Sequence, residues 1–240
     1  MGWIRESIKK YIYKEKYSSE TYINYLRRLG MTIGDGVTIF DPFNVFIDPS
    51  RPYLIKIGNN VQITRGVTIL THGFDWSVIK GKYGDILGSS GGVEIGDNVF
   101  IGMNSIVLKG CHIGNNVIIG AGSVITHSIK SDSVVAGNPA RVLMSLDDYY
   151  QKRKLAQEEE AKELVQQFRI ITGKEPSERE LHEFFFLFTD NADNLNPLYN
   201  SMLNICGNRS HSIDILQSRK AKYKSFNDFL MSINDTQGDE

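Results

Sequence analysis

Large aliphatic residues recur every six positions between residues 33 and 125. The in-phase positions are Ile33, Ile39, Ile57, Ile63, Ile69, Ile95, Ile101, Val107, Ile113, Ile119 and Ile125. A period of two would indicate an amphipathic strand, and a period of 3.6 would indicate a helix. A period of six fits neither, and it indicates a short strand followed by a corner, repeated many times.

Smaller side chains occupy a second register, four positions after many of the large ones. They are Val37, Val61, Val67, Val99, Ser105, Cys111, Val117 and Ser123. Gly often follows the large residue directly, and Asn or Gly often precedes the small one, which suits the backbone angles of tight corners. We therefore expect stacked rungs around a continuous apolar column. The alternative, a sandwich of short antiparallel strands, does not explain the corner residues.

One segment, VEIGDNVFIGMNSIVLKGCHIGNNVIIGAGSVITHSIKSDSVVAGNPARV from Val93 to Val142, carries the clearest repeats. It resembles the hexapeptide-repeat acyltransferases, especially the galactoside and maltose O-acetyltransferases and their capsule and lipopolysaccharide relatives. The resemblance covers roughly residues 31–145. It implies a left-handed parallel β-helix of triangular cross-section, a homotrimer, and active sites between neighbouring subunits.

Helical patterns flank the repeats, so we expect a helical leader over residues 1–30, the β-helix over 31–145 and a helical appendage over 146–240. In the leader, helices are predicted over 3–12 and 18–29, the second capped by Ser18 or Ser19 and ended by Gly30. Packing against one end of the coil is the plain interpretation of this leader, and substrate binding is the alternative.

The appendage has its own apolar pattern, in which one predicted helical stripe is Ala161, Leu164, Val165, Phe168 and Ile171. A capping box at Ser177 and Glu180 predicts a second helix, with the stripe Leu181, Phe184, Phe185 and Phe188. A loop over 190–196, short helices after it and disorder over 235–240 are expected. The appendage either packs on the coil or neighbouring subunits, or recognises a polymeric acceptor.

The repeat breaks once, because 26 residues separate Ile69 from Ile95. Residues 72–92 should therefore leave the coil as a loop, and loops on rigid scaffolds often carry function. His72 stands at the start of this loop. Histidine suits a general base near neutral pH, and Thr71-His72 matches the catalytic Thr-His segment of the resembled family. The alternative is a polar residue that merely ends a rung.

Four further residues are candidates for binding the acceptor. Asp75 either orients the imidazole, binds acceptor hydroxyls or is a solvated carboxylate. Trp76 and Tyr83 could stack on a sugar ring or pin the loop to the coil. Asn44 corresponds to an acceptor-contacting Asn of the resembled family.

The resemblance also implies a binding site for acetyl-CoA along the later rungs. The matching positions are Met103, Gly120, Ala121, Gly122, Thr126, His127 and Arg141. The small residues would let backbone approach the pantetheine arm, and Arg141 could bind the phosphates. Many relatives have Lys where this chain has His127.

Composition and charge give no support to several classes of function, although a net charge does not exclude a local basic patch. A formal net charge of −1 gives no reason to expect nucleic acid or an anionic membrane as partner. We expect no membrane span, because no apolar run is long enough. Two cysteines are too few for a disulfide framework, and residues 1–16 lack the apolar core of a signal peptide, which favours the cytoplasm. No three-histidine spacing indicates a metal site.

Together these features predict an O-acetyltransferase that moves acetyl from acetyl-CoA to a hydroxyl of a saccharide, such as a surface-polysaccharide precursor or polymer. The alternatives are an N-acyltransferase acting on an amino sugar and a non-catalytic β-helix scaffold. A serine acetyltransferase fits less well, since those relatives carry their helical domain before the coil.

Overall fold

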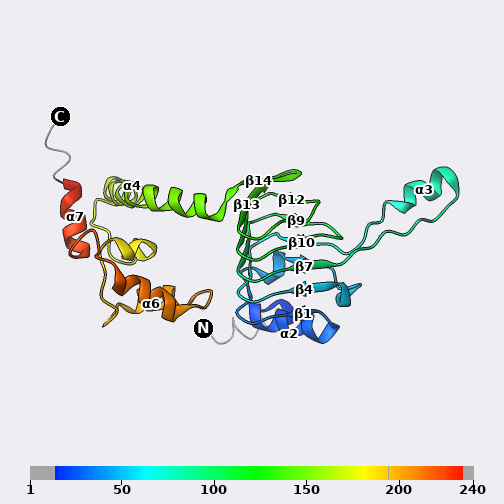
Figure 1. The fold of residues 1–240 in the computed structure, drawn as a ribbon, viewed down its shortest axis with the longest axis horizontal. Coiled ribbons are helices and arrows are strands. Elements are labelled where there is room, and N and C mark those ends of the chain that lie inside the picture. The colour runs from blue at the N-terminus through cyan, green and yellow to red at the C-terminus, as the bar shows by residue number, and fades with distance from the viewer. Residues whose placement is uncertain (1–13, 194, 235–240) are drawn as a thin grey trace. The chain divides into compact units, whose positions relative to one another are not determined.

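The computed structural model describes residues 14–193 and 195–234 (Figure 1). The chain forms two compact units, the first ending at Tyr149 and the second beginning at Tyr150. Repeats dominate the first unit, whereas the second is helical.

Three sheets of short strands build the first unit. The first sheet contains β1 (Thr32–Ile33), β4 (Ile55–Ile57), β7 (Val93–Ile95) and β10 (His112–Ile113). The second contains β2 (Thr38–Ile39), β5 (Gln62–Ile63), β8 (Val99–Ile101), β11 (Val117–Ile119), β13 (Ser133–Gly137) and β14 (Ala140–Ser145). The third contains β3 (Phe46–Ile47), β6 (Thr68–Ile69), β9 (Ile106–Val107) and β12 (Val124–Ile125).

Successive strands pass from sheet to sheet, so the chain winds into a parallel β-helix (Figure 1). The register places equivalent residues directly above one another. Ile57 pairs with Ile33 on one side and Ile95 on the other, and Ile101 pairs with Ile63 and Ile119. All eleven in-phase aliphatic residues are buried, which confirms the predicted apolar column.

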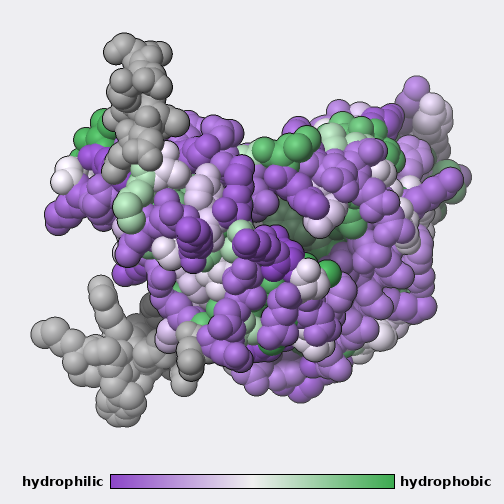
Figure 2. All heavy atoms as spheres, turned by 60° about the vertical axis from the view of Figure 1, so that its left-hand side comes forward, coloured by the Kyte–Doolittle hydropathy of each residue, from purple (hydrophilic) through white to green (hydrophobic). Residues whose placement is uncertain are grey.

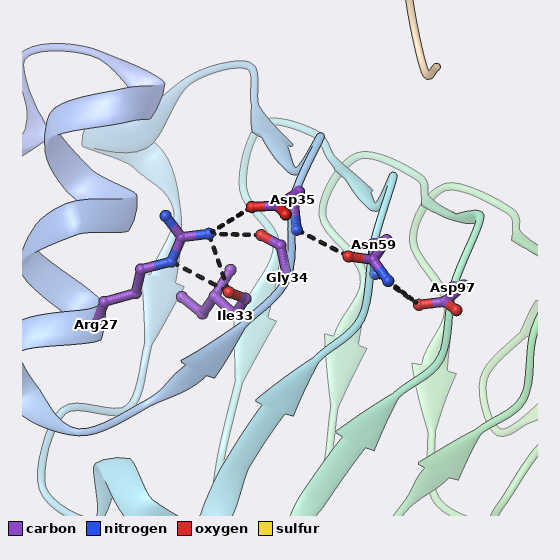
Figure 3. A network of polar contacts seen from close by, with 6 residues as sticks. All are labelled: Arg27, Ile33, Gly34, Asp35, Asn59 and Asp97. Carbon is purple, nitrogen blue, oxygen red and sulfur yellow. Dashed lines mark hydrogen bonds and ion pairs between the residues drawn. The ribbon is translucent and has the colours of Figure 1, made fainter. Parts of the chain in front are cut away.

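Side chains at the corners join neighbouring rungs (Figure 3). The Asn59 side chain accepts from the amide of Asp35 at 2.9 Å, and Asp97 accepts from the amide of Asn59 at 2.6 Å. Asn115 accepts in the same way from the amide of Asp97 at 2.8 Å. This ladder satisfies corner amides that form no strand bond. Arg27 ends it, donating to the carbonyl of Gly34 and pairing with Asp35 at 3.7 Å.

A second corner confirms the predicted role of asparagine. Asn60, Asn98 and Asn116 have φ values of 53°, 54° and 56°, and Gly36 has the equivalent place with φ 68°. Asparagine tolerates this left-handed backbone conformation better than most residues. Asn98 also donates to Asn116 at 2.9 Å, so the corner is held by side chains as well as by backbone geometry.

The helix α2 (Ser19–Leu29) follows the short 3₁₀ helix η1 (Lys14–Lys16) and packs on β1 and β2. Ser18 caps its start and Gly30, at φ 107°, ends it, as the sequence predicts. Tyr22 and Leu26 are buried in the same core as the aliphatic column. The helix predicted over 3–12 lies outside the described residues.

Irregular features interrupt the coil and end it. The 3₁₀ helices η2 (Pro42–Asn44) and η3 (Pro52–Leu54) flank β3. The long excursion between β6 and β7 contains the helix α3 (Trp76–Tyr83), where the sequence analysis expects only a loop. At the last rung, β13 and β14 form an antiparallel hairpin through the cis Asn138–Pro139 peptide.

The second unit contains the long helix α4 (Leu146–Thr172), which crosses the unit boundary, then the 3₁₀ helix η4 (His182–Leu187). The remaining helices are α5 (Pro197–Asn204), α6 (Arg209–Ser218) and α7 (Phe226–Asn234), as expected after the loop. They share a second core that includes Ala161, Val165, Phe185, Leu216 and Phe229.

Two expectations for this unit are wrong. Ile171 ends the predicted stripe, but its side chain is 79% exposed and does not belong to the core. The surface in general is mostly hydrophilic, with small hydrophobic patches, on the face that Figure 2 shows. The α-helix predicted after Ser177 is instead η4, although Ser177 and Glu180 do form the predicted cap contact. Phe184, Phe185 and Phe186 all pack on the core, which one face of an α-helix would not allow.

Candidate active site

The predicted catalytic histidine lies where the chain leaves the coil. Leu70 still donates to the carbonyl of Val107, as a rung residue would. His72 then bridges to Ser90, and the amide of Gly91 donates to the carbonyl of Thr71 at 3.0 Å. The two ends of the excursion are thus tied together at its base, while α3 extends away from the coil without a buried residue (Figure 1).

His72 is held by a buried carboxylate. Its Nδ1 lies 2.8 Å from Oδ2 of Asp48, which is only 2% exposed, and the His72 side chain is 35% exposed. Ser50 Oγ lies 3.5 Å from the same Nδ1. The imidazole is therefore fixed on one edge and open to solvent on the other.

Asp48 accepts five hydrogen bonds. Ser50 donates through its amide and hydroxyl, Thr71 donates through its amide and hydroxyl, and His72 donates through Nδ1. Burial alone raises the pKa of this carboxyl group, but the bonds from Thr71, Ser50 and His72 outweigh it and hold the pKa well below its ordinary value. Asp48 is consequently an anion at neutral pH.

This contact determines the form of the imidazole. An ionised carboxylate can only accept, so Nδ1 of His72 must carry the hydrogen. In the neutral ring, Nε2 then has the free lone pair. A base with an oriented lone pair and a buried anion behind it is suited to removing a proton from a hydroxyl group.

The sequence analysis missed Asp48 because the first rungs are irregular. Ile47 of β3 pairs with Ile69 of β6, which brings Asp48 beside Thr71 and His72 although 24 residues separate Asp48 from His72. Extra residues in the segments that contain η2 and η3, on either side of β3, remove Ile47 from the six-residue phase. Only the strand register shows that Asp48 follows β3 at a buried position next to His72.

The acceptor candidates are spread over two regions. Asp75 precedes α3 and makes no side-chain cap, and Trp76 lies against Phe74 with 4.7 Å between ring centroids. Tyr83, at the other end of α3, is 69% exposed. Asn44, in η2, donates to Asp41 at 2.7 Å. The hydrogen-bond partners of the His72 ring within the described residues are Asp48 and Ser50, so Asp75 does not orient it here.

Three of the cofactor candidates meet in one hollow. Thr126, His127 and Arg141 line a cavity of about 590 Å³, within the usual range for small-molecule sites. Thr126 Oγ1 lies 2.8 Å from Nδ1 of His127. Lys130 also lines the cavity, and the sequence analysis missed it. Two permanent cations, Arg141 and Lys130, therefore lie at the end of the coil where they could bind phosphate.

The other cofactor candidates lie at one corner of the coil. The amide of Gly122 donates to the carbonyl of Met103 at 2.7 Å, and Met103 is 47% exposed. Ala121 is exposed at the same corner. A Cβ atom on Gly120 would lie 2.9 Å from Cβ of Ala136. Packing between rungs thus accounts for glycine at position 120 without a ligand.

Comparisons with known proteins agree with this fold. The sequence model for "Bacterial transferase hexapeptide (six repeats)" matches residues 92–127. Protein CapG of Staphylococcus aureus is 42% identical over 127 residues, which are 53% of this chain and 73% of CapG. The putative acetyltransferase YvoF of Bacillus subtilis is 27% identical over 135 residues, 56% of this chain and 73% of YvoF.

Two solved structures are also similar. A hexapeptide-repeat acetyltransferase of Vibrio cholerae complexed with acetyl coenzyme A is 22% identical, with TM-score 0.44 and coverage of 59% of this chain and 85% of that one. A maltose O-acetyltransferase of Clostridium difficile is 27% identical, with TM-score 0.39 and coverage of 58% of this chain and 81% of that one.

Among the described residues, no helix has the length and hydropathy needed to cross a bilayer.

The match to CapG spans 73% of that protein, and residues 92–127, which the family model matches, lie within the coil. This chain, with its left-handed parallel β-helix, belongs to the bacterial hexapeptide-repeat transferases, the acyltransferase family that its repeat resembles.

Proposed function

We propose that this protein transfers an acetyl group from acetyl-CoA to a hydroxyl group of a saccharide, with His72 as the general base. The observation that carries the proposal is the hydrogen bond between Asp48 and His72, where the excursion leaves the coil. Membership of the transferase family and the acetyltransferase names of similar proteins support the reaction type. The saccharide acceptor rests on the resemblance of the segment from Val93 to Val142 to the galactoside and maltose O-acetyltransferases.

The chemistry follows from the orientation of the imidazole. Nε2 of His72 takes the proton of the acceptor hydroxyl as its oxygen attacks the thioester carbonyl. The tetrahedral intermediate collapses, the C–S bond breaks, and the imidazolium returns the proton to the departing thiolate. The Asp48 anion stabilises the imidazolium between these two steps. No covalent acyl-enzyme is needed, because both substrates bind together.

The remaining candidates take roles around this base. Arg141 and Lys130 would bind the phosphates of CoA in the hollow beside Thr126 and His127. The corner of Met103 and Gly120–Gly122 would border the pantetheine arm. Asn44, Asp75, Trp76 and Tyr83 would bind the acceptor near His72. The homotrimer with sites between subunits rests on the resemblance to the hexapeptide-repeat acyltransferases.

The proposal is tested by measuring free thiol released from acetyl-CoA in the presence of neutral sugars, amino sugars and oligosaccharides. We expect acceptor-dependent release that falls by about 10³-fold in His72→Ala, because the base is lost. His112→Ala is the matched control, since His112 is another exposed histidine of the coil, and its ring contacts Glu94 and not Asp48.

Each outcome has a definite meaning. Equal loss in His72→Ala and His112→Ala would remove His72 from its proposed role. Release with amines but not with hydroxyl acceptors would replace O-acetylation by N-acetylation. A size measurement on the same protein tests the trimer, for which we expect three times the chain mass of 27.1 kDa.

A further inference from the structure

The second unit contains a groove that the proposed reaction does not use. Two adjoining hollows, of about 580 and 430 Å³, share the residues Lys154, Gln157, Phe186 and Arg219. We name their union the basic groove. It lies wholly within residues 150–222, between α4, η4, the end of α6 and the segment that follows α6. Each of the two hollows is within the usual size range for small-molecule sites.

Positive charge dominates the lining of the basic groove. Five cations line it, Arg153, Lys154, Arg219, Lys220 and Lys222, against the two carboxylates Glu158 and Glu183. Of these cations, two pair with carboxylates: Arg153 with Glu160 and Lys222 with Glu158. Lys154, Arg219 and Lys220 make no ion pair with any described residue. The groove therefore keeps an excess of positive charge available for an anion.

Arg219 lies at the junction of the two hollows and is partly buried. Its guanidinium stands 4.3 Å from the centre of the Phe186 ring and donates to the carbonyl of Phe186. Its Nε is buried and has no hydrogen-bond partner within the described residues. Burial lowers the pKa of the Arg219 guanidinium, but arginine stays protonated. Asp190 acts on Arg219 electrostatically but forms no ion pair with it. A partly buried cation without an ion-pair partner is stabilised when an anion binds nearby.

Aromatic and amide groups accompany the charges. Tyr150 is 55% exposed, and Phe184 and Phe186 line the same hollow. The C–H face of a sugar ring packs well on such rings, and Gln157 offers both a donor and an acceptor to hydroxyl groups. No glycine lines either hollow, so the groove lacks the backbone cradle typical of diphosphate sites. Because the cations are spread along the groove, they suit a ligand with several separate anionic groups better than a ligand with one diphosphate.

We propose that the basic groove binds a carboxylate-bearing oligosaccharide, with Lys154, Arg219 and Lys220 facing successive carboxylates and the aromatic rings stacking on the sugars. This is a binding site distinct from the acetyl-transfer centre. The proposal stands independently of the transfer reaction, because it concerns binding alone.

The test is calorimetric titration of the full chain with tetragalacturonate, a linear acidic oligosaccharide, without acetyl-CoA. We expect binding that weakens as ionic strength rises and that falls by about tenfold or more in the double variant Lys154→Gln/Lys220→Gln. Both lysines are exposed, so folding should be unaffected. The matched control is Lys174→Gln, an exposed lysine outside the groove, whose affinity should stay within about twofold of wild type.

Several results would overturn the proposal. One is an absence of binding at millimolar tetragalacturonate, and another is an equal loss in the Lys174→Gln control, which would indicate unspecific attraction. Equally tight binding of neutral maltotetraose would remove the role of charge. Displacement of tetragalacturonate by a lower concentration of UDP-glucose would assign the groove to a nucleotide sugar. None of these results bears on acetyl transfer, which the thiol-release assay tests separately.

Discussion

At the scale of single residues, the central feature is a buried carboxylate that several hydrogen bonds hold in place. Asp48 is almost inaccessible to solvent, and the hydrogen bonds it accepts come from Ser50, Thr71 and His72. An unpaired buried charge would be strongly destabilising. Here the donors keep it ionised, and they also fix its direction toward the imidazole. The same contacts therefore stabilise the rung and prepare the base.

Asp48→Asn tests this positioning role. The amide has nearly the same shape, but it can donate to Nδ1 and thereby favour the wrong imidazole tautomer, and it cannot stabilise the imidazolium. We expect kcat for thiol release to fall by about 10²-fold or more, with a smaller change in KM.

The control for this variant is Asp85→Asn, which removes an exposed carboxylate from the same excursion. A merely structural role of Asp48 would lower the amount of folded protein without changing the kcat of the folded fraction. Circular dichroism measures the folded fraction of each variant, and dividing the rate of thiol release by that fraction distinguishes the two cases. An unchanged pH profile of kcat in Asp48→Asn would also contradict the positioning role.

At the scale of elements, the corners decide how closely rungs can stack. The ladder of Asn59, Asp97 and Asn115 runs past Gly58 and Gly96 at the same corner. A Cβ atom on Gly58 would lie 2.4 Å from Oδ1 of Asp97 and 2.7 Å from the carbonyl carbon of Gly96. Since backbone cannot yield as a side chain does, glycine at this corner is a packing requirement.

Gly58→Ala should therefore lower the free energy of unfolding of the first unit by about 2–3 kcal/mol. Gly81→Ala is the matched control, because a Cβ there meets no atom within 4 Å and lies within α3. That control should be neutral or stabilise by up to about 1 kcal/mol. Urea unfolding followed by circular dichroism measures both, and equal effects would show that rung spacing adjusts to the added carbon.

At the scale of the whole molecule, the described residues form two hydrophobic cores that share no residue. Ile101 belongs to the core of the coil, and Phe229 belongs to the core of the helical unit, and both are fully buried. Each core is contained within one of the two compact units. The units are thus expected to unfold as separate cooperative bodies.

Differential scanning calorimetry should show two transitions. Ile101→Ala should lower only one midpoint and Phe229→Ala only the other, since each deletion costs about 3–5 kcal/mol within its own core. Each variant serves as the control for the other. A single transition lowered by both variants would contradict independent units.

Much of the first unit followed from the sequence alone. Local sequence determines the six-residue period, the Gly and Asn corners and the position of the excursion, because every rung repeats the same residue types. Ser18 and Gly30 likewise bound α2 by local capping. His72 could be proposed as the base because it stands where the period breaks and because Thr71-His72 matches the catalytic segment of the resembled family.

The tertiary structure decided what depends on residues far apart in the chain. Asp48 meets His72 only because β3 stacks on β6, and an insertion between them hides that register from the period. In the second unit, aromatic residues on several sides of η4 enter one core, so the helical pattern alone gave the wrong element. Arg219 reaches Phe186 through packing between distant segments. Local chemistry specifies repeats and corners, whereas long-range packing selects which side chains meet.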